Sequence, residues 1–119
     1  MSESILRDKS KKLAKNIVLI YKEIKQNHRE SVLTNQLLRS GTSIGANIHE
    51  AQYAQGTADF ISKLEIALKE ASETGYWLEL LYRTKYIDEP SFKSLSSKCS
   101  SLRVMLISSC KTAKQNLDK

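Results

Sequence analysis

The sequence is poor in residues that interrupt helices, with one proline and four glycines among 119 residues. A β-sandwich or barrel needs frequent turns, and turns draw heavily on glycine and proline. Because 40% of the residues are hydrophobic, the composition is also too apolar for a disordered segment. These scarcities favour an all-α fold, and the length fits a single domain over residues 1–119.

Long apolar runs are also missing. No stretch approaches the roughly 20 apolar residues that span a bilayer. The polar N-terminus, MSESILRDKSKK, lacks the apolar segment of a secretory signal. We therefore expect a cytoplasmic protein with no membrane partner.

Cysteine is scarce, with only Cys99 and Cys110 present, eleven residues apart. Within one helix this spacing separates them by about 16 Å, which is too far for a disulfide. They also lack the paired Cys/His spacing of a zinc site. We expect reduced thiols inside a helical core.

Apolar residues recur at spacings of three and four, the pattern of helices that each bury one face. The first predicted helix covers about residues 4–27, and its apolar stripe consists of Leu6, Leu13, Ile17, Ile20 and Ile24. The second covers about residues 34–55 and ends at Gly56. Thr34 is its predicted N-cap, and Leu33 and Leu38 are placed to form a hydrophobic staple.

The third predicted helix covers about residues 57–85, with an apolar seam at Ile61, Leu64, Leu68, Ala71, Gly75, Leu78 and Tyr82. Further apolar residues lie beside or away from this seam, namely Phe60, Ile66, Tyr76, Trp77, Leu80 and Leu81. A monomer would expose part of that surface, which favours self-association.

The fourth predicted helix follows the start signal Asp88-Glu89-Pro90 and continues to about Leu117. Its apolar stripe consists of Phe92, Leu95, Cys99, Leu102, Leu106 and Ala113. The short connections make successive helices antiparallel, so the sequence predicts an up-down-up-down four-helix bundle.

The segment SGTSIGANIHEA, residues 40–51, contains two glycines inside a predicted helix. Gly41 and Gly45 each cost about 1 kcal/mol relative to alanine there. We expect close packing of a neighbouring helix to compensate, ahead of approach by a ligand. Ile44 and Ile48 continue the apolar seam, with Ala51 after them.

Two polar residues of this segment, Asn47 and Glu50, are adjacent on one helix face. They are candidates for a buried network with Glu70 or Glu73, although solvated or capping roles fit the sequence equally well. Ser43 lies one turn before Asn47.

The sequence shows no pattern of a catalytic or metal site. His49-Glu50 begins like the HExxH zinc motif, but Tyr53 stands where the second histidine is required. Di-metal bundle sites need a Glu-x-x-His pair on each of two helices, and neither a phosphate loop nor a nucleophile elbow is present. We expect no enzymatic activity, no metal and no cofactor.

Positive charge is concentrated at the two ends of the chain. Residues 1–29 carry eight Lys/Arg against three Asp/Glu, residues 30–86 five against seven, and residues 87–119 six against three, so +5, −2 and +3 give the net +6. Near one face of the first helix lie Arg7, Lys11, Lys15, Lys22, Lys25 and Arg29. From the neighbouring fourth helix, we expect the same surface to be extended by Lys98, Arg103, Lys111 and Lys114.

Such a stripe is typical of proteins that bind nucleic-acid phosphates. A basic face that only keeps the protein soluble explains the same charge equally well.

The run SGTSIGANIHEA followed by ADFISKLEIALKEASETGYWLELL resembles the bacterial four-helix bundle family encoded in intervening sequences of 23S rRNA genes. The resemblance extends over most of the chain, and its specific part lies between Leu33 and Leu81. It is carried by Ser43, Ile44, Asn47, Ile48 and Glu50, together with Tyr76-Trp77-Leu78. His49 and Ala51 stand where many members carry alanine and glycine.

The resemblance implies a bundle that assembles into a homopentamer with a basic surface. A related branch is the accessory variability determinant of diversity-generating retroelements, which binds nucleic acid and partners a reverse transcriptase. The leading hypothesis is an oligomeric accessory protein that binds nucleic acid, with RNA preferred over DNA because of the family's genomic setting. The alternative is a protein–protein scaffold with no direct nucleic-acid role.

Overall fold

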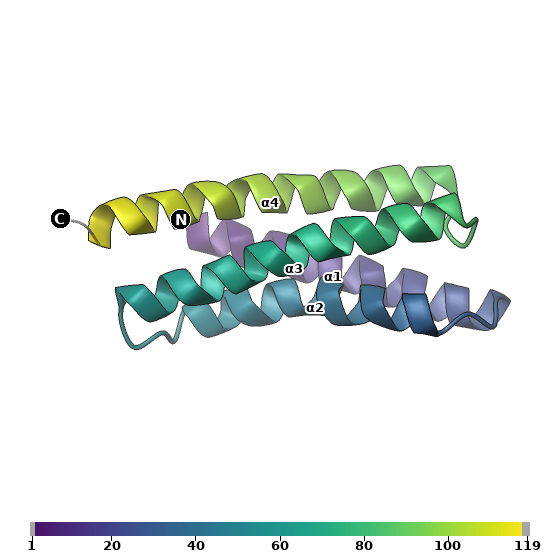
Figure 1. Ribbon diagram of the computed structural model, residues 1–119, viewed down its shortest axis with the longest axis horizontal. Coiled ribbons are helices and arrows are strands. Elements are labelled where there is room, and N and C mark those ends of the chain that lie inside the picture. The colour runs from purple at the N-terminus through teal and green to yellow at the C-terminus, as the bar shows by residue number, and fades with distance from the viewer. Residues whose placement is uncertain (1, 118–119) are drawn as a thin grey trace.

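The computed structural model describes residues 2–117 and contains four antiparallel helices (Figure 1). They are α1 (Ser2–Asn27), α2 (Val32–Ala51), α3 (Thr57–Arg83) and α4 (Glu89–Leu117). Each helix packs against two neighbours, so that α1 contacts α2 and α4 while α3 lies diagonally across the bundle from α1. The predicted four-helix bundle is confirmed. Within residues 2–117, no helix is long and apolar enough to cross a bilayer.

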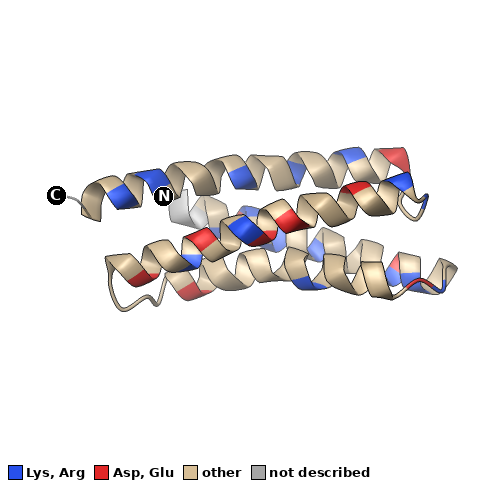
Figure 2. Ribbon diagram, in the orientation of Figure 1, with Lys and Arg blue, Asp and Glu red and all other residues tan. Residues whose placement is uncertain are grey.

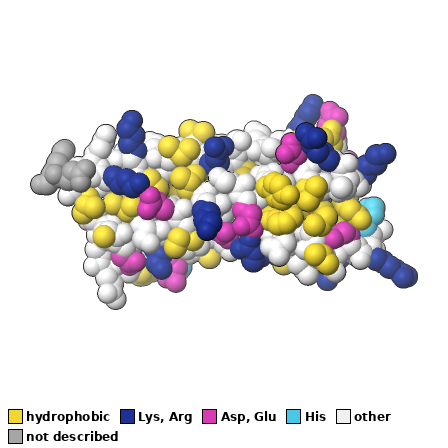
Figure 3. All heavy atoms as spheres, in the orientation of Figure 1, with side chains coloured by type: hydrophobic (Ala, Val, Ile, Leu, Met, Phe, Trp, Pro, Cys, Tyr) yellow, Lys and Arg dark blue, Asp and Glu magenta, His cyan; other side chains and the backbone are white. Residues whose placement is uncertain are grey.

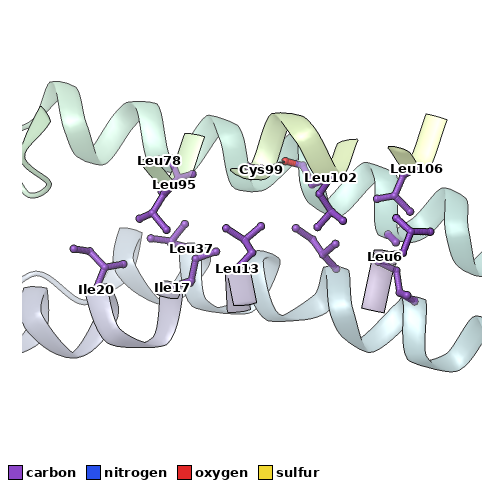
Figure 4. Close-up of a cluster of buried hydrophobic side chains, with 14 of the residues drawn as sticks. Leu6, Leu13, Ile17, Ile20, Leu37, Leu78, Leu95, Cys99, Leu102 and Leu106 are labelled. Atoms are coloured by element: carbon purple, nitrogen blue, oxygen red, sulfur yellow. Dashed lines mark hydrogen bonds between the residues drawn. The ribbon is translucent and has the colours of Figure 1, made fainter. Parts of the chain in front are cut away.

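The core runs along the bundle axis and is built mainly of leucine and isoleucine (Figure 4). All five predicted core residues of α1 are buried. Figure 4 shows Leu13 and Ile17 of α1 pointing toward Leu95 and Leu102 of α4. Full burial of each such side chain contributes about 1.5–3 kcal/mol.

The buried face of α3 differs from the predicted seam in its register. Ala67, Thr74 and Leu81 are fully buried, whereas Gly75 and Tyr82 remain partly exposed. A helix has about 3.6 residues per turn, so its buried face drifts away from a strict alternation of three and four. Leu81, which the sequence placed beside or away from the predicted seam, is therefore part of the core.

Small residues let α2 approach α1 closely. A Cβ added to Gly41 would collide with the Ile17 side chain, and one added to Gly45 would lie 3.3 Å from Ser10 Oγ. The predicted packing role of both glycines is confirmed. On the other side of α2, the hydroxyls of Ser40 and Thr74 lie 3.0 Å apart in the α2–α3 interface.

The start of α2 was predicted two residues too late. The helix begins at Val32, and Thr34 is fully buried in its first turn. Glu30 caps the helix in its place, because its carboxylate accepts the backbone N–H of Leu33 at 2.8 Å and that of Thr34 at 2.9 Å. The prediction of Thr34 as N-cap is wrong.

The other helix ends are set by residues that lie next to them in the chain. α2 ends at Ala51, and Gly56 is the N-cap of α3 rather than the end of α2. α3 ends two residues before the predicted Lys85, which adopts a left-handed φ of 72° that ends a helix. The start signal of α4 is confirmed, because Asp88 Oδ1 accepts the Ser91 backbone N–H at 2.9 Å.

Candidate nucleic-acid interface

Charge is distributed unevenly among the four helices. α1 carries seven Lys/Arg against three Asp/Glu (+4), α2 one against one (0), α3 three against five (−2) and α4 five against one (+4). Figure 2 shows the acidic residues of α3 on the near side of the bundle, with α1 behind. Because α1 is diagonal to α3, the acidic helix is the one farthest from the basic residues of α1.

The outer face of α1 presents an exposed row of lysines, which we call the α1 lysine row: Lys11, Lys15 and Lys22. At about 1.5 Å of rise per residue, the row spans about 16 Å. Among the side chains that the structure describes, no ion pair involves any of the three. In a helical projection of α1, Asp8 lies beside the α1 lysine row and is the acidic residue of α1 closest to Lys15.

The other three basic residues predicted for this surface, Arg7, Lys25 and Arg29, have different environments. Arg7 is half-buried and its Nη1 donates to Gln52 Oε1 at 3.2 Å, which joins the first turns of α1 to the end of α2. Lys25 Nζ lies 5.4 Å from the ring centroid of Tyr21. Arg29 is exposed in the connection between α1 and α2.

The four predicted residues of α4 divide between two sides of that helix. Lys98 lines a groove of 360 Å³ between α1 and α4, together with Glu23. Arg103 lies instead beside Gly75 of α3, and Lys111 and Lys114 lie beside Glu65 of α3.

Lys114 Nζ is 2.8 Å from Glu65 Oε2, and the hydrogen bond and charge of Glu65 raise the pKa of Lys114. The expectation that all four α4 residues extend the surface of α1 therefore holds for Lys98 alone. With about 100° per residue, position 98 faces away from positions 103 and 114.

Within segment 40–51, Asn47 and Ser43 form their hydrogen bonds inside α2. Asn47 Nδ2 donates to the Ser43 carbonyl at 2.8 Å, and Ser43 Oγ donates to the Arg39 carbonyl at 2.6 Å. Glu50 is exposed. Ile44 and Ile48 are buried, as predicted.

A polar network does connect α2 to α3, but Arg39 forms it. Its Nη1 lies 2.8 Å from Glu70 Oε2, and its Nη2 pairs with Glu73. Glu73 also accepts the Trp77 indole N–H at 3.1 Å. The sequence signal for this network was a pair of carboxylates, Glu70 and Glu73, one turn apart on α3. Arg39, the lone basic residue of α2, lies opposite them. Of the alternatives left open for Asn47 and Glu50, a network with Glu70 or Glu73 is not found among the described residues, and the exposed Glu50 fits the solvated alternative.

Apolar side chains gather on the face formed by α2 and α3, as the space-filling view shows (Figure 3). Tyr76 is 59% exposed and Ile66 41% exposed. The ring centroids of Tyr76 and the partly buried Trp77 are 5.0 Å apart. This surface is the one from which self-association was predicted.

Both cysteines are free and buried, as predicted. Cys99 Sγ lies 3.2 Å from the Ala71 carbonyl, and burial raises the pKa of Cys99 to about 11. Its thiol is therefore protonated at neutral pH and a poor nucleophile. Among the described residues, no three His, Cys, Asp or Glu side chains come together as a metal site would require.

The fold and its surface charge define a small four-helix bundle protein with a basic first helix. The chain belongs to the 23S rRNA-intervening sequence protein family, whose model matches residues 2–108. It is similar to the crystal structure of a protein of unknown function from the S23 ribosomal protein family of Bacteroides thetaiotaomicron. The two are 50% identical with a TM-score of 0.91, over 93% of this chain and 99% of that one. No curated protein matches the chain significantly.

Proposed function

We propose that the protein is a non-enzymatic accessory protein of the cytoplasm that binds nucleic acid through the outer face of α1. The observation that carries this proposal is the α1 lysine row, which is exposed, free of ion pairs among the described side chains and diagonal to the acidic α3. RNA is preferred over DNA because of the genomic setting of the family, whose name refers to intervening sequences of 23S rRNA.

The chemistry of this surface is phosphate neutralisation. Each lysine that contacts a phosphate displaces condensed counterions, so affinity falls with salt by a log–log slope of about −0.9 per contact on a DNA duplex and about −0.7 on a single strand. Ammonium groups on a helix surface read little base sequence, so weak sequence preference is expected.

The test is a titration of structured RNA, duplex DNA and single-stranded DNA at two salt concentrations. The variant Lys11→Glu/Lys15→Glu/Lys22→Glu should lose at least tenfold in affinity and flatten the salt slope by about 2. The matched control is Lys69→Glu/Lys85→Glu/Lys111→Glu, which changes net charge equally at exposed lysines outside α1 that form no ion pair among the described side chains. Equal losses in both variants would show that net charge alone is responsible and would remove α1 from the proposal.

A second candidate function is a protein–protein scaffold, and the exposed Tyr76 and Ile66 on α3 favour it. The same apolar surface supports assembly into a homo-oligomer, for which the family resemblance implies a pentamer. In the scaffold function, the basic surface meets an acidic protein partner, and a reverse transcriptase is the partner implied by the related branch. Capture of one defined partner that survives nuclease treatment, without binding to any of the three nucleic acids, would favour the scaffold.

A further inference from the structure

Two exposed aromatic rings lie together at the end of α2. Tyr53 is 72% exposed, and its ring centroid is 5.3 Å from that of the exposed His49, with an angle of 54° between the planes. The Tyr53 backbone N–H donates to the Glu50 carbonyl at 3.1 Å, so the turn after α2 holds the tyrosine one turn beyond His49. We call these two rings the aromatic pair.

The aromatic pair lies beside the basic end of α1. Gly45, one turn before His49, sits against Ser10 of α1, and His49 shares that side of α2. Gln52, which precedes Tyr53, accepts the hydrogen bond of Arg7. Because α1 and α2 are antiparallel, the pair is placed next to the first turns of α1, where Arg7 and Lys11 lie. Glu50 falls about 100° around the helix from His49, toward α3.

We propose that the aromatic pair is a stacking platform for a base of a single-stranded nucleic acid whose phosphates follow the α1 lysine row. This inference rests on the proposed function and adds the substrate class. In a duplex, the bases stack on one another and expose no face to a protein ring, whereas an unpaired base stacks well on an aromatic side chain. Lysines alone would not distinguish single strands from duplexes, and the exposed rings supply that distinction.

The aromatic residues on α3 are poorly placed for the same task. Trp77 donates its indole N–H to Glu73, and Glu70 lies one turn away. These carboxylates repel a phosphate backbone, although Arg39 offsets part of their charge. Tyr76 also lies on the surface proposed for self-association, so the control position is Val32, which is 73% exposed at the other end of α2.

The experiment measures binding of a short oligouridylate and of a fully paired RNA duplex by the full chain. Tyr53→Ala should weaken oligouridylate binding about tenfold, while Tyr53→Phe, which keeps the ring, should leave it unchanged. Neither change should alter duplex binding, and Val32→Ala should alter the binding of neither ligand. All of these side chains are exposed, and circular dichroism should show unchanged helix content.

Two results would overturn the inference while leaving the proposed function intact. In the first, Tyr53→Ala and His49→Ala bind oligouridylate as tightly as the wild type, while the variant of the α1 lysine row loses binding. The other is an equal loss of oligouridylate and duplex binding in Tyr53→Ala. A wild-type protein that binds neither ligand at low salt would overturn the platform together with the function on which it rests.

Discussion

Gly41 of α2 lies so close to Ile17 of α1 that a Cβ at this position has no room beside the isoleucine side chain. Ile17 is completely buried, so it has little freedom to move aside. By contrast, a Cβ added to Gly75 of α3 meets nothing within 4 Å. Adding a Cβ at these two helical glycines should therefore have opposite effects on the stability of the fold.

Replacement of the two glycines by alanine should change stability in opposite directions. Gly41→Ala should lower the free energy of unfolding by about 1–2 kcal/mol, because overpacking outweighs the gain in helix propensity. Gly75→Ala should raise it by about 0.5–1 kcal/mol, because alanine restricts the unfolded chain and creates no clash. Urea unfolding measures both, and Gly41→Ala/Ile17→Val should recover part of the loss. A destabilised Gly75→Ala would show that the surface above α3 is occupied in solution.

The Glu30 cap predicts a pH dependence of stability. Partial burial opposes ionisation of Glu30, but hydrogen bonds from the Thr34 hydroxyl and from the backbone N–H groups of Leu33, Thr34 and Val32 outweigh it and lower the pKa of Glu30. A carboxylate whose pKa is lower in the folded state stabilises the protein above its unfolded pKa. That stabilisation disappears as pH falls through the folded pKa.

Glu30→Gln should therefore lower the free energy of unfolding at pH 7 by about 1 kcal/mol, a typical capping contribution. The difference from wild type should shrink as pH falls below the ordinary glutamate value of 4.5. Chemical unfolding at pH 7 and in acid measures it. Glu50→Gln, at an exposed carboxyl of the same helix, is the control and should have little effect at either pH. A constant difference across pH would contradict the capping role.

The Arg39 network should stabilise the α2–α3 interface more than an ordinary surface ion pair. Glu70 has a side-chain exposure of only 12%, so Arg39→Ala leaves two neighbouring carboxylates on α3 without their counter-charge. The expected loss is about 1 kcal/mol, and it should decrease at high salt. Arg83→Ala, which breaks the exposed Arg83–Glu79 pair, should cost almost nothing. Thermal unfolding at two salt concentrations compares the variants, and equal losses would remove any special role for Arg39.

The proposed self-association makes a prediction that separates two exposed tyrosines. A charge at Tyr76 would be buried in an oligomer interface formed by α3, so Tyr76→Glu should reduce the mass in light scattering to that of a monomer. Tyr53→Glu introduces the same charge at a more exposed ring in the turn after α2 and should leave the mass unchanged. Wild-type protein that is monomeric at micromolar concentration would rule out the oligomer.

Apolar periodicity was sufficient to predict the four helices and every apolar core residue of α1. A helix that buries one face must repeat its apolar residues about every 3.6 residues. Asp88 was predictable for a similar reason, since its side chain acts within its own turn. The Glu30 cap was missed because the pattern favours Ser, Thr, Asp or Asn at the N-cap, and here a longer carboxylate reaches over Ser31 from outside the helix.

The arrangement of charged and aromatic side chains on the surface could be predicted only in part from the sequence. The exposed lysines of α1 follow from the position of one helix's own apolar stripe, so local periodicity was enough. Helical periodicity alone places Lys98 on another side of α4 from Arg103 and Lys114, but which side meets α1 depends on how the helices are rotated. The pairing of Arg39 with Glu70 and Glu73, and the placement of His49 and Tyr53 beside Arg7, depend on the rotation and shift of neighbouring helices as well. Those rotations are set by side-chain packing between helices, such as Gly41 against Ile17, and only the tertiary structure contains that information.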